Sequence, residues 1–199
     1  RAAKSAPSNA RALKQFARAA SKVGFDVTMI DRDDIGRLAE FDALFIRETT
    51  NVNHHTYRFA RRAAAEGLVV IDDPQSIVLC TNKVFLAELL QKNGVPAPKS
   101  LMLHRGNTDE VLEALGLPCV LKEPDGSFSK GVIKVTTLEE FHKSVEELMR
   151  KSELLIAQEF LPTDFDWRIG VFNRHPIFAS RYYMVKKHWQ IIKHTQEGK

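Results

Sequence analysis

Short apolar runs alternate with helix-like stretches at the start of the chain, and this alternation limits the fold more than any other feature. The apolar runs are Phe25–Ile30, Phe41–Ile46 and Leu68–Ile71, and the stretches with helical spacing are residues 8–22 and 54–66. Strands that alternate with helices form parallel sheets covered by helices on both faces. The sequence therefore predicts an α/β class, with an N-terminal parallel βα domain over residues 1–73.

The pattern changes after Asp72-Asp73-Pro74, a turn signal. One long helix is predicted over residues 75–93, followed by the extended segment Pro96-Ala97-Pro98. Strands are then predicted at Ser100–Leu103, Pro118–Lys122, Val132–Val135, Leu154–Phe160, Trp167–Phe172 and Pro176–Tyr183, with helices at 108–115 and 138–150. We expect a linker with its helix over residues 74–98, an α+β subdomain over 99–157, and the start of another over 158–199.

Composition excludes several classes of protein. Of the 199 residues, 44% are hydrophobic and 27% are charged, as in ordinary globular proteins. The net charge of +4 comes from scattered basic residues rather than from a stripe, which argues against a nucleic-acid-binding protein. Cys80 and Cys119 are far apart, which favours reduced thiols and a cytoplasmic protein. No apolar run reaches the roughly 20 residues that a membrane span needs.

The stretch VLKEPDGSFSKGVIKV, from Val120 to Val135, places a lysine at the end of one apolar strand and a small-residue turn before the next. Glycines at such a turn let backbone N–H groups approach an anion, and hydroxyls and ammonium groups add donors. We therefore expect a phosphate-binding loop built from Lys122, Gly126, Ser127, Ser129 and Gly131. The alternative is a β-hairpin with a polar turn, because the common P-loop pattern is absent.

Two further segments carry candidate binding residues. An edge strand ending at Gln158-Glu159-Phe160-Leu161 can offer backbone groups and apolar side chains to an adenine ring. In Asp166-Trp167-Arg168, alternation places the carboxylate and the guanidinium on one face, suited to a ribose and to an anion, and Arg181 is expected to join that face. The alternatives are an ordinary strand end and a cross-strand ion pair.

The order of these elements resembles the ATP-grasp superfamily, and in particular its RimK-like carboxylate–amine ligases. The stretch DDPQSIVLCTNKVFLAELLQKNGVPAPKS resembles that family's segment with an N-K pair, a helix and a G-[IV]-P-x-P motif. FDWRIGVFNRHPIFASRYYM resembles its D-[IW]-R-[VI] strand and hairpin. The resemblance covers roughly residues 72–199 and implies a pre-ATP-grasp-like domain followed by part of an ATP-grasp fold.

The resemblance also implies roles for individual residues. Lys83 and Lys122 match the lysines that hold the ATP phosphates, and the loop matches the one that closes over them. Glu159 and Leu161 match the adenine-facing segment, and Asp166 matches the acid that contacts ribose. Arg168 matches an arginine near the reacting phosphate and the substrate. Relatives often have glycine where this chain has Ser129.

The implied activity joins a carboxylate to an amine with ATP, through an acyl phosphate. The implied partners are ATP, magnesium, a carboxylate substrate, and an amine from an amino acid, peptide or protein terminus, glutamate being one candidate. The family's magnesium ligands, an Asp and a Glu-x-Asn pair, have no match after Arg181. We expect them beyond Lys199 in a longer protein, the alternative being a degenerate copy.

Residues outside these motifs carry weaker expectations. Arg47-Glu48-Thr49-Thr50 follows a predicted parallel strand, where crevices form, so Arg47 is expected to face the substrate, the alternative being a surface turn. The histidines are expected to be mostly surface residues without a catalytic role. A non-catalytic ATP-binding module is the alternative function, a membrane partner is not expected, and a homo-oligomer is compatible with the sequence.

Overall fold

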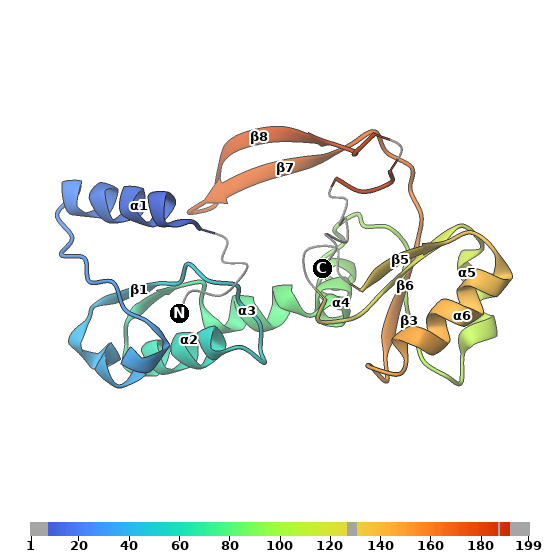
Figure 1. Ribbon diagram of the computed structural model, residues 1–199, viewed down its shortest axis with the longest axis horizontal. Helices are drawn as coiled ribbons and strands as arrows, with labels where there is room; N and C mark the ends of the chain where they lie inside the picture. The colour runs from blue at the N-terminus through green and yellow to red at the C-terminus, as the bar shows by residue number, and fades with distance from the viewer. Residues whose placement is uncertain (1–7, 127–130, 187, 192–199) are drawn as a thin grey trace, which may run out of the picture. The chain divides into compact units, whose positions relative to one another are not determined.

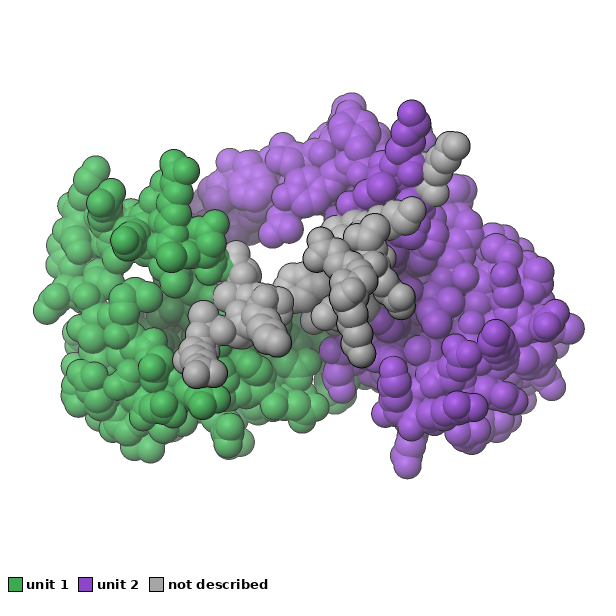
Figure 2. Space-filling view, viewed as in Figure 1, with its two compact units in different colours: residues 1–96 green, residues 97–199 purple. Residues whose placement is uncertain are grey.

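The computed structural model describes residues 8–126, 131–186 and 188–191. The chain divides into two compact units, residues 1–96 and residues 97–199 (Figures 1 and 2). The finer division into functional subdomains that the sequence predicts stays a prediction.

The first unit contains a parallel pair of strands and the helices around it (Figure 1). β1 pairs with β2 in parallel, with Ala43 opposite Val69 and Phe45 opposite Ile71, as the alternation of strands and helices predicts. Asn9 caps α1 through its side-chain oxygen, 2.9 Å from the Ala12 amide nitrogen. The elements of this unit are α1 (Ala10–Lys22), η1 (Arg32–Glu40), β1 (Ala43–Phe45), α2 (His55–Ala65), β2 (Val69–Ile71), α3 (Pro74–Thr81) and α4 (Lys83–Lys92).

The core of the first unit lies on one face of the β1–β2 pair. Leu38 of η1 and Phe59 and Ala63 of α2 are buried there, packed against Leu44 and other apolar side chains. On the other face, Phe45, Val69 and Ile71 are exposed, at 48%, 67% and 43%. Among the described residues, helices therefore pack closely on one face of this sheet, whereas α1 meets the other face through an edge-on contact between the Phe16 and Phe45 rings.

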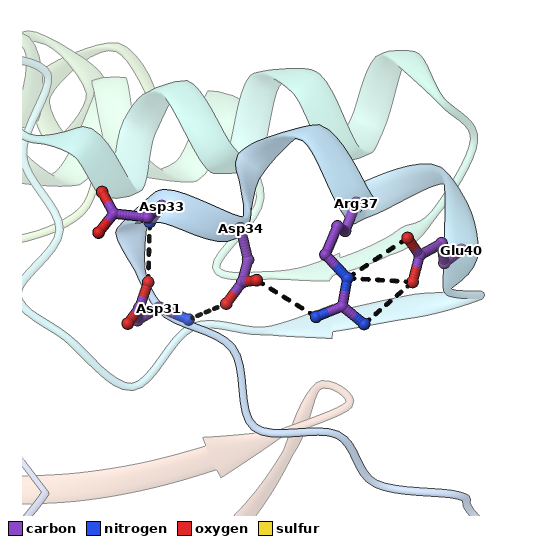
Figure 3. Close-up of polar contacts among 5 residues, drawn as sticks. All are labelled: Asp31, Asp33, Asp34, Arg37 and Glu40. Carbon is purple, nitrogen blue, oxygen red and sulfur yellow. Dashed lines mark hydrogen bonds and ion pairs between the residues drawn. The ribbon is translucent and has the colours of Figure 1, made fainter.

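Phe25–Ile30 is not a strand, although its composition predicts one. The segment forms no ladder with β1 or β2, and a strand exists only where a neighbour supplies its hydrogen bonds. The chain instead enters the 3₁₀ helix η1, which the apolar pattern does not predict. Its start is a capping box, in which the Asp31 carboxylate accepts from the Asp33 amide and the Asp34 carboxylate accepts from the Asp31 amide (Figure 3). Arg37 then pairs with both Asp34 and Glu40, at 3.2 and 3.0 Å (Figure 3).

The helix predicted over residues 75–93 is two helices, α3 and α4, with Asn82 between them. Asn82 has extended backbone angles, and its side-chain oxygen accepts from the amides of Val84 and Phe85, so it ends α3 and caps α4. Short polar side chains compete with helical hydrogen bonding in this way, which is why the apolar spacing alone misses the break.

The second unit contains an antiparallel sheet with the order β3-β6-β4-β5 (Figure 1). All six strands and helices up to β6 begin and end within two residues of the sequence-based prediction; the largest difference is at α6, which ends at Leu148 rather than at residue 150. The elements are β3 (Ser100–Leu103), α5 (Thr108–Leu115), β4 (Cys119–Lys122), β5 (Val132–Val135), α6 (Leu138–Leu148) and β6 (Leu155–Glu159).

The two faces of this sheet have different surroundings. Helices α5 and α6 cover one face of the sheet (Figure 1). The side chains fully buried on that face, together with Phe141, are Leu103, Leu121, Val135, Leu155 and Ala157. Cys119 belongs to the same core, and burial raises the pKa of its thiol. Because side chains alternate along a strand, the neighbouring residues point to the opposite face, where the candidate site lies.

A two-stranded hairpin, β7 (Phe165–Phe172) and β8 (His175–Tyr183), follows the sheet. Asn173 and Arg174 both have positive φ angles, 46° and 65°, as in the two-residue turns whose twist matches that of a hairpin. The predicted hairpin is therefore confirmed. In the described part of the chain, no helix is both long enough and apolar enough to cross a membrane.

Candidate functional site

Four polar side chains gather on the face of the second unit's sheet that the helices leave uncovered. Lys122 ends β4, Lys134 lies in β5, Gln158 lies in β6 and Ser100 begins β3. The strand pairing aligns them: Gln158 lies opposite Ser100 on one side and Val120 on the other, and Lys134 is also opposite Val120. All four side chains are half-buried. The sheet therefore presents donors and acceptors from four strands on one face.

A chain of hydrogen bonds fixes the position of the Lys122 ammonium group. Its Nζ donates to Gln158 Oε1 at 2.5 Å, and Gln158 Nε2 donates to Ser100 Oγ at 2.7 Å. Ser100 Oγ in turn donates to the Pro98 carbonyl at 2.9 Å. Each group in this series is a donor or an acceptor that suits its neighbour, and the Gln158 amide is therefore oriented with its oxygen towards the lysine and its nitrogen towards Ser100. The series ties the end of β4 to the segment that enters β3.

Lys122 and Lys134 are diagonal neighbours across β4 and β5, because Lys122 lies opposite Val132 and Lys134 opposite Val120. Diagonal neighbours in an antiparallel pair are about 7–8 Å apart. Lys134 Nζ lies 3.6 Å from the centroid of the Phe160 ring, which holds it on this face. Two ammonium groups on one half-buried face favour an anion bound between them. The pair is therefore suited to a phosphate chain.

The predicted phosphate loop leaves β4 and returns to β5 next to this face. The Glu123 amide donates to the Gly131 carbonyl at 2.9 Å, which closes the base of the loop, and the Gly126 amide donates to the Glu123 carbonyl at 3.3 Å. Gly131 has a φ of 65°, in the left-handed region that favours glycine. Ser127 and Ser129 lie outside the described residues. The loop thus begins directly after Lys122, as the sequence predicts.

The adenine-facing segment differs from the expectation in one respect. β6 is a central strand between β3 and β4, not an edge strand. The Glu159 amide donates to the Lys99 carbonyl at 2.9 Å, and a Glu159 carboxylate oxygen accepts from the Lys99 amide at 2.7 Å. The Glu159 amide is thus used within the sheet, because both neighbouring strands continue to its level. A base would have to be met by Phe160 and Leu161, which follow β6.

The hairpin separates the three residues that the sequence places on one face. Asp166 and Arg168 are both exposed and share a face of β7, as predicted. Arg181 does not join them: it lies opposite Trp167, and directly opposed residues share a face. Its guanidinium lies 5.0 Å from the Trp167 ring, whereas Arg168 lies 5.6 Å from the Tyr182 ring. The prediction that Arg181 joins this face is wrong, because hairpin register, which the sequence does not reveal, decides the face.

The remaining predicted residues, Lys83 and Arg47, lie in the first unit. Lys83 is the first residue of α4, directly after the Asn82 cap, and is half-buried. The Arg47 guanidinium lies 4.9 Å from the Phe16 ring and 5.2 Å from the Phe45 ring, and donates to Ser8 Oγ at 2.7 and 3.0 Å. Arg47 also lines a cavity of about 420 Å³ within this unit, together with Glu48 and His55.

Sequence reasoning missed Lys134 and Ser100. Lys134 was detectable, because period-two alternation places it on the same strand face as Val132 and a hairpin then brings that face to Lys122. It also expected mostly surface histidines, whereas His54 and His55 are half-buried. Burial, and then the neighbouring His55, lower the pKa of His54, although Glu48 acts in the opposite sense.

Comparison with known proteins places this sheet and its loop in context. No known family profile matches the chain. Over 124 residues the chain is 27% identical to the alpha-aminoadipate–LysW ligase LysX of Saccharolobus solfataricus. This matched region is 59% of this chain and 44% of that ligase. A solved RimK domain ATP-grasp protein from Sphaerobacter thermophilus superimposes with a TM-score of 0.54 at 19% identity, over 61% of this chain and 47% of that one. The chain has an ATP-grasp fold.

A third protein extends the comparison over most of the chain. D-alanine–D-alanine ligase from Bacillus anthracis superimposes with a TM-score of 0.64 at 16% identity, over 83% of this chain and 56% of that one. The superfamily resemblance and the mixed α/β fold inferred from the sequence are thus confirmed. The matches span about half the length of each of these proteins.

Proposed function

We propose that the protein is an ATP-dependent carboxylate–amine ligase of the RimK-like kind, whose ATP phosphates bind on the uncovered face of the sheet. One observation carries this proposal: Lys122 is held by Gln158 and Ser100, at the base of a glycine-bounded loop and diagonal to Lys134. The ATP-grasp fold and the similarity to a ligase named for joining alpha-aminoadipate to LysW support the same reading.

The proposed reaction has two steps. A substrate carboxylate oxygen attacks the γ-phosphorus of ATP, the bond to the β,γ-bridging oxygen breaks, and ADP leaves. An amine then attacks the carbonyl of the acyl phosphate and expels phosphate, and the amine loses a proton to give the amide. The first step brings two anions together, so cations must offset their repulsion and the charge that develops.

The chain's own residues meet these demands in the proposal. Lys122 and Lys134 lower the repulsion between triphosphate and carboxylate, and the hydrogen-bond chain from Gln158 to Pro98 positions one of them before ATP arrives. The loop over residues 124–130 excludes water, which would otherwise hydrolyse an acyl phosphate. The resemblance implies that Lys83 contacts phosphate and that Arg168 contacts phosphate and substrate. Arg47 is proposed to contact the substrate. The adenine ring is proposed to contact Phe160 and Leu161.

No group of three metal-ligating side chains lies among the described residues of the second unit. Within the parts of the chain that the structure describes, the group of three metal-ligating side chains is Glu48, His54 and His55, which lies in the first unit and contains two imidazoles. Magnesium prefers oxygen ligands. The magnesium ligands therefore stay a prediction.

The substrates are also part of the proposal. A glutamate or another amino acid, a peptide or a protein terminus would supply the amine, as the RimK-like resemblance implies. The two thiols, Cys80 and Cys119, are both free, which supports a cytoplasmic location for the protein. Neither nucleic acid nor membrane is among the proposed partners.

Calorimetric titration with magnesium-ATP tests the phosphate site. Lys122→Ala should weaken ATP binding by about 10- to 100-fold, since hydrogen bonds to charged groups contribute about 1.5–3 kcal/mol. Lys143→Ala is the matched control, because it removes the same charge from an exposed position of α6, and α6 covers the opposite face of the sheet from the proposed site. Equal ATP affinity in Lys122→Ala and the parent would refute the assignment of Lys122.

A non-catalytic ATP-binding module is the second candidate. It rests on the same phosphate-binding face, because Lys122 held by Gln158 would bind a phosphate with or without turnover. The two candidates differ in turnover: a ligase releases ADP in response to a carboxylate and an amine, and a binding module does not. ATP binding without such release, in the protein's complete natural form, would favour the module.

A further inference from the structure

Glu48, His54 and His55 meet at one point of the first unit, where the segment after β1 passes the start of α2. His54 is the N-cap of α2, His55 is its first residue, and Glu48 follows β1 by three positions. One potential ligand atom from each residue lies within 4.8 Å of the other two, and all three residues are half-buried. Two imidazoles and a carboxylate in this arrangement form a ligand set for a metal ion.

The spacing of two of these groups fits a tetrahedral metal. His55 Nε2 lies 3.1 Å from Glu48 Oε2. Ligands at about 2.0–2.2 Å from zinc in a tetrahedral arrangement are roughly 3.4 Å apart. A small side-chain rotation is therefore enough for both atoms to bind the same ion. Without a metal, the same pair forms an ion pair when His55 is protonated.

The third group, His54, is oriented by a hydrogen bond of its other ring nitrogen. His54 Nδ1 lies 3.0 Å from Thr56 Oγ1, and the Thr56 hydroxyl donates to the Thr49 carbonyl at 3.1 Å. The Thr56 amide also points at Nδ1, which accepts from it at 3.5 Å, so Thr56 orients the ring through two groups. Binding a metal through Nε2 requires the tautomer in which Nδ1 carries the proton and donates it to Thr56 Oγ1, and in that tautomer Nε2 keeps its lone pair. Metal-binding histidines are usually held in this way, by a hydrogen bond from the nitrogen that does not bind the metal.

A buried hydroxyl next in sequence to Glu48 gives an independent indication. Thr49 Oγ1 is buried and has no hydrogen-bond partner among the described residues. Buried polar atoms are nearly always paired, and an unpaired one is explained by strain, by a functional role, or by a bound water or ion. Thr56, which orients His54, is only 3% exposed, so the framework around the three ligands is fixed by packing.

We propose that Glu48, His54 and His55 bind a divalent transition metal, with zinc as the preferred ion. Imidazole nitrogen favours zinc over magnesium, which takes oxygen ligands. Three protein ligands leave one position for water or another ligand. Glu48 and His55 also line the cavity that Arg47 lines, so an anion in that cavity would meet the metal and a guanidinium together. The proposal does not depend on the ligase activity.

Zinc chloride titration of the 199-residue chain, followed by calorimetry, tests the site. The experiments use a Cys80→Ser background, because Cys80 is an exposed thiol and thiolates bind zinc. We expect one zinc ion per chain. Glu48→Gln and His55→Asn should each weaken the affinity by roughly 100-fold, since even the loss of an orienting group costs 10- to 100-fold. His142→Ala removes an exposed imidazole of α6 and should leave the affinity unchanged.

Cobalt(II) gives a readout that does not depend on the variants. The parent chain with one equivalent of cobalt should develop the strong visible absorption of a tetrahedral site, and added zinc should remove it. Circular dichroism in metal-free buffer checks that each variant is folded. Zinc affinity that is the same in Glu48→Gln as in the parent overturns the proposal. A parent spectrum identical to that of cobalt in water also overturns the proposal, whatever the variants show. The three residues would then be an ion pair, Glu48 with His55, beside the imidazole of His54.

Discussion

The ammonium group of Lys122 donates to the side-chain carbonyl of Gln158 on the neighbouring strand, and the same amide donates to Ser100. A flexible lysine would otherwise sample many rotamers, and its ordering on ATP binding would cost affinity. The Gln158 amide holds it in place beforehand. Gln158 therefore positions the lysine of the proposed phosphate site, and it can do so without touching ATP itself.

Replacing Gln158 tests this positioning role. Gln158→Ala should weaken ATP binding, but by less than Lys122→Ala, because the lysine charge remains while its orientation is lost. In a double-mutant cycle, the two changes should be non-additive by about 0.5–3 kcal/mol, as expected for residues in contact. Calorimetry on the parent, both single variants and the double variant measures this coupling. Full additivity would show that Gln158 does not act through Lys122.

Gly131 at the base of the loop should not tolerate a side chain. Its φ is 65°, and a Cβ atom there would lie 2.7 Å from the Glu123 side chain. The Glu123 side chain can move, but the left-handed conformation costs an alanine about 1–2 kcal/mol. Gly131→Ala should therefore lower the free energy of unfolding of the second unit by about that amount in urea titration. Gly106→Ala is the control, because Gly106 has no such φ and would meet only the His104 side chain, at 3.3 Å.

Gly170 and Phe178 form a cross-strand pair in which the ring covers the glycine. A Cβ atom at Gly170 would lie 2.1 Å from the Phe178 ring, so Gly170→Ala must displace the ring or open the hairpin. We expect a change in the fluorescence of Trp167 and a loss of hairpin amide protection in hydrogen exchange. Phe178→Ala in the same chain removes the obstacle. The double variant should then protect the hairpin better than Gly170→Ala alone, and if it does not, steric contact is not the cause.

Local patterns predicted the second unit well, and long-range pairing set the limit. The boundaries of β3 and β5 follow from apolar runs and from the turn signals beside them. The central position of β6 and the register that separates Arg181 from Arg168 depend on which strands meet. Nothing local encodes that choice. The same reason applies to Phe25–Ile30, whose composition suits a strand but which forms no ladder in the described chain.

In the candidate site, too, local patterns predicted single residues, and long-range pairing decided which of them meet. Lys122 and Gln158 were both candidates from the sequence, but 36 residues separate them, and their contact needs the pairing of β4 with β6. Lys134 was missed although alternation together with a β4–β5 hairpin places it beside Lys122. The contact of Glu48 with His55 required the loop after β1 to return to the start of α2, which no periodicity reveals.

Asp73 should make the stability of the first unit depend on pH. Its side chain accepts from the Ser76 hydroxyl at 2.5 Å and from the amides of Ser76 and Gln75 at 3.0 Å, so it caps α3. These hydrogen bonds, chiefly those from Ser76, hold the pKa of the Asp73 carboxyl below its usual value. A folded-state pKa below the unfolded one stabilises the fold above the unfolded pKa, near 3.9. That stabilisation is lost as pH falls through the folded-state pKa.

The measurement is the free energy of unfolding against pH, from neutral to about pH 2, for the parent and for Asp73→Asn. Asparagine keeps a cap oxygen but cannot titrate, so the variant should lose less stability on acidification than the parent. Ser76→Ala removes the main cause of the lowered pKa and should also flatten the acid limb, while costing about 1 kcal/mol at neutral pH. If both variants lose stability over acid pH as steeply as the parent, the acid sensitivity of the unit resides in other carboxylates and Asp73 acts only as a cap.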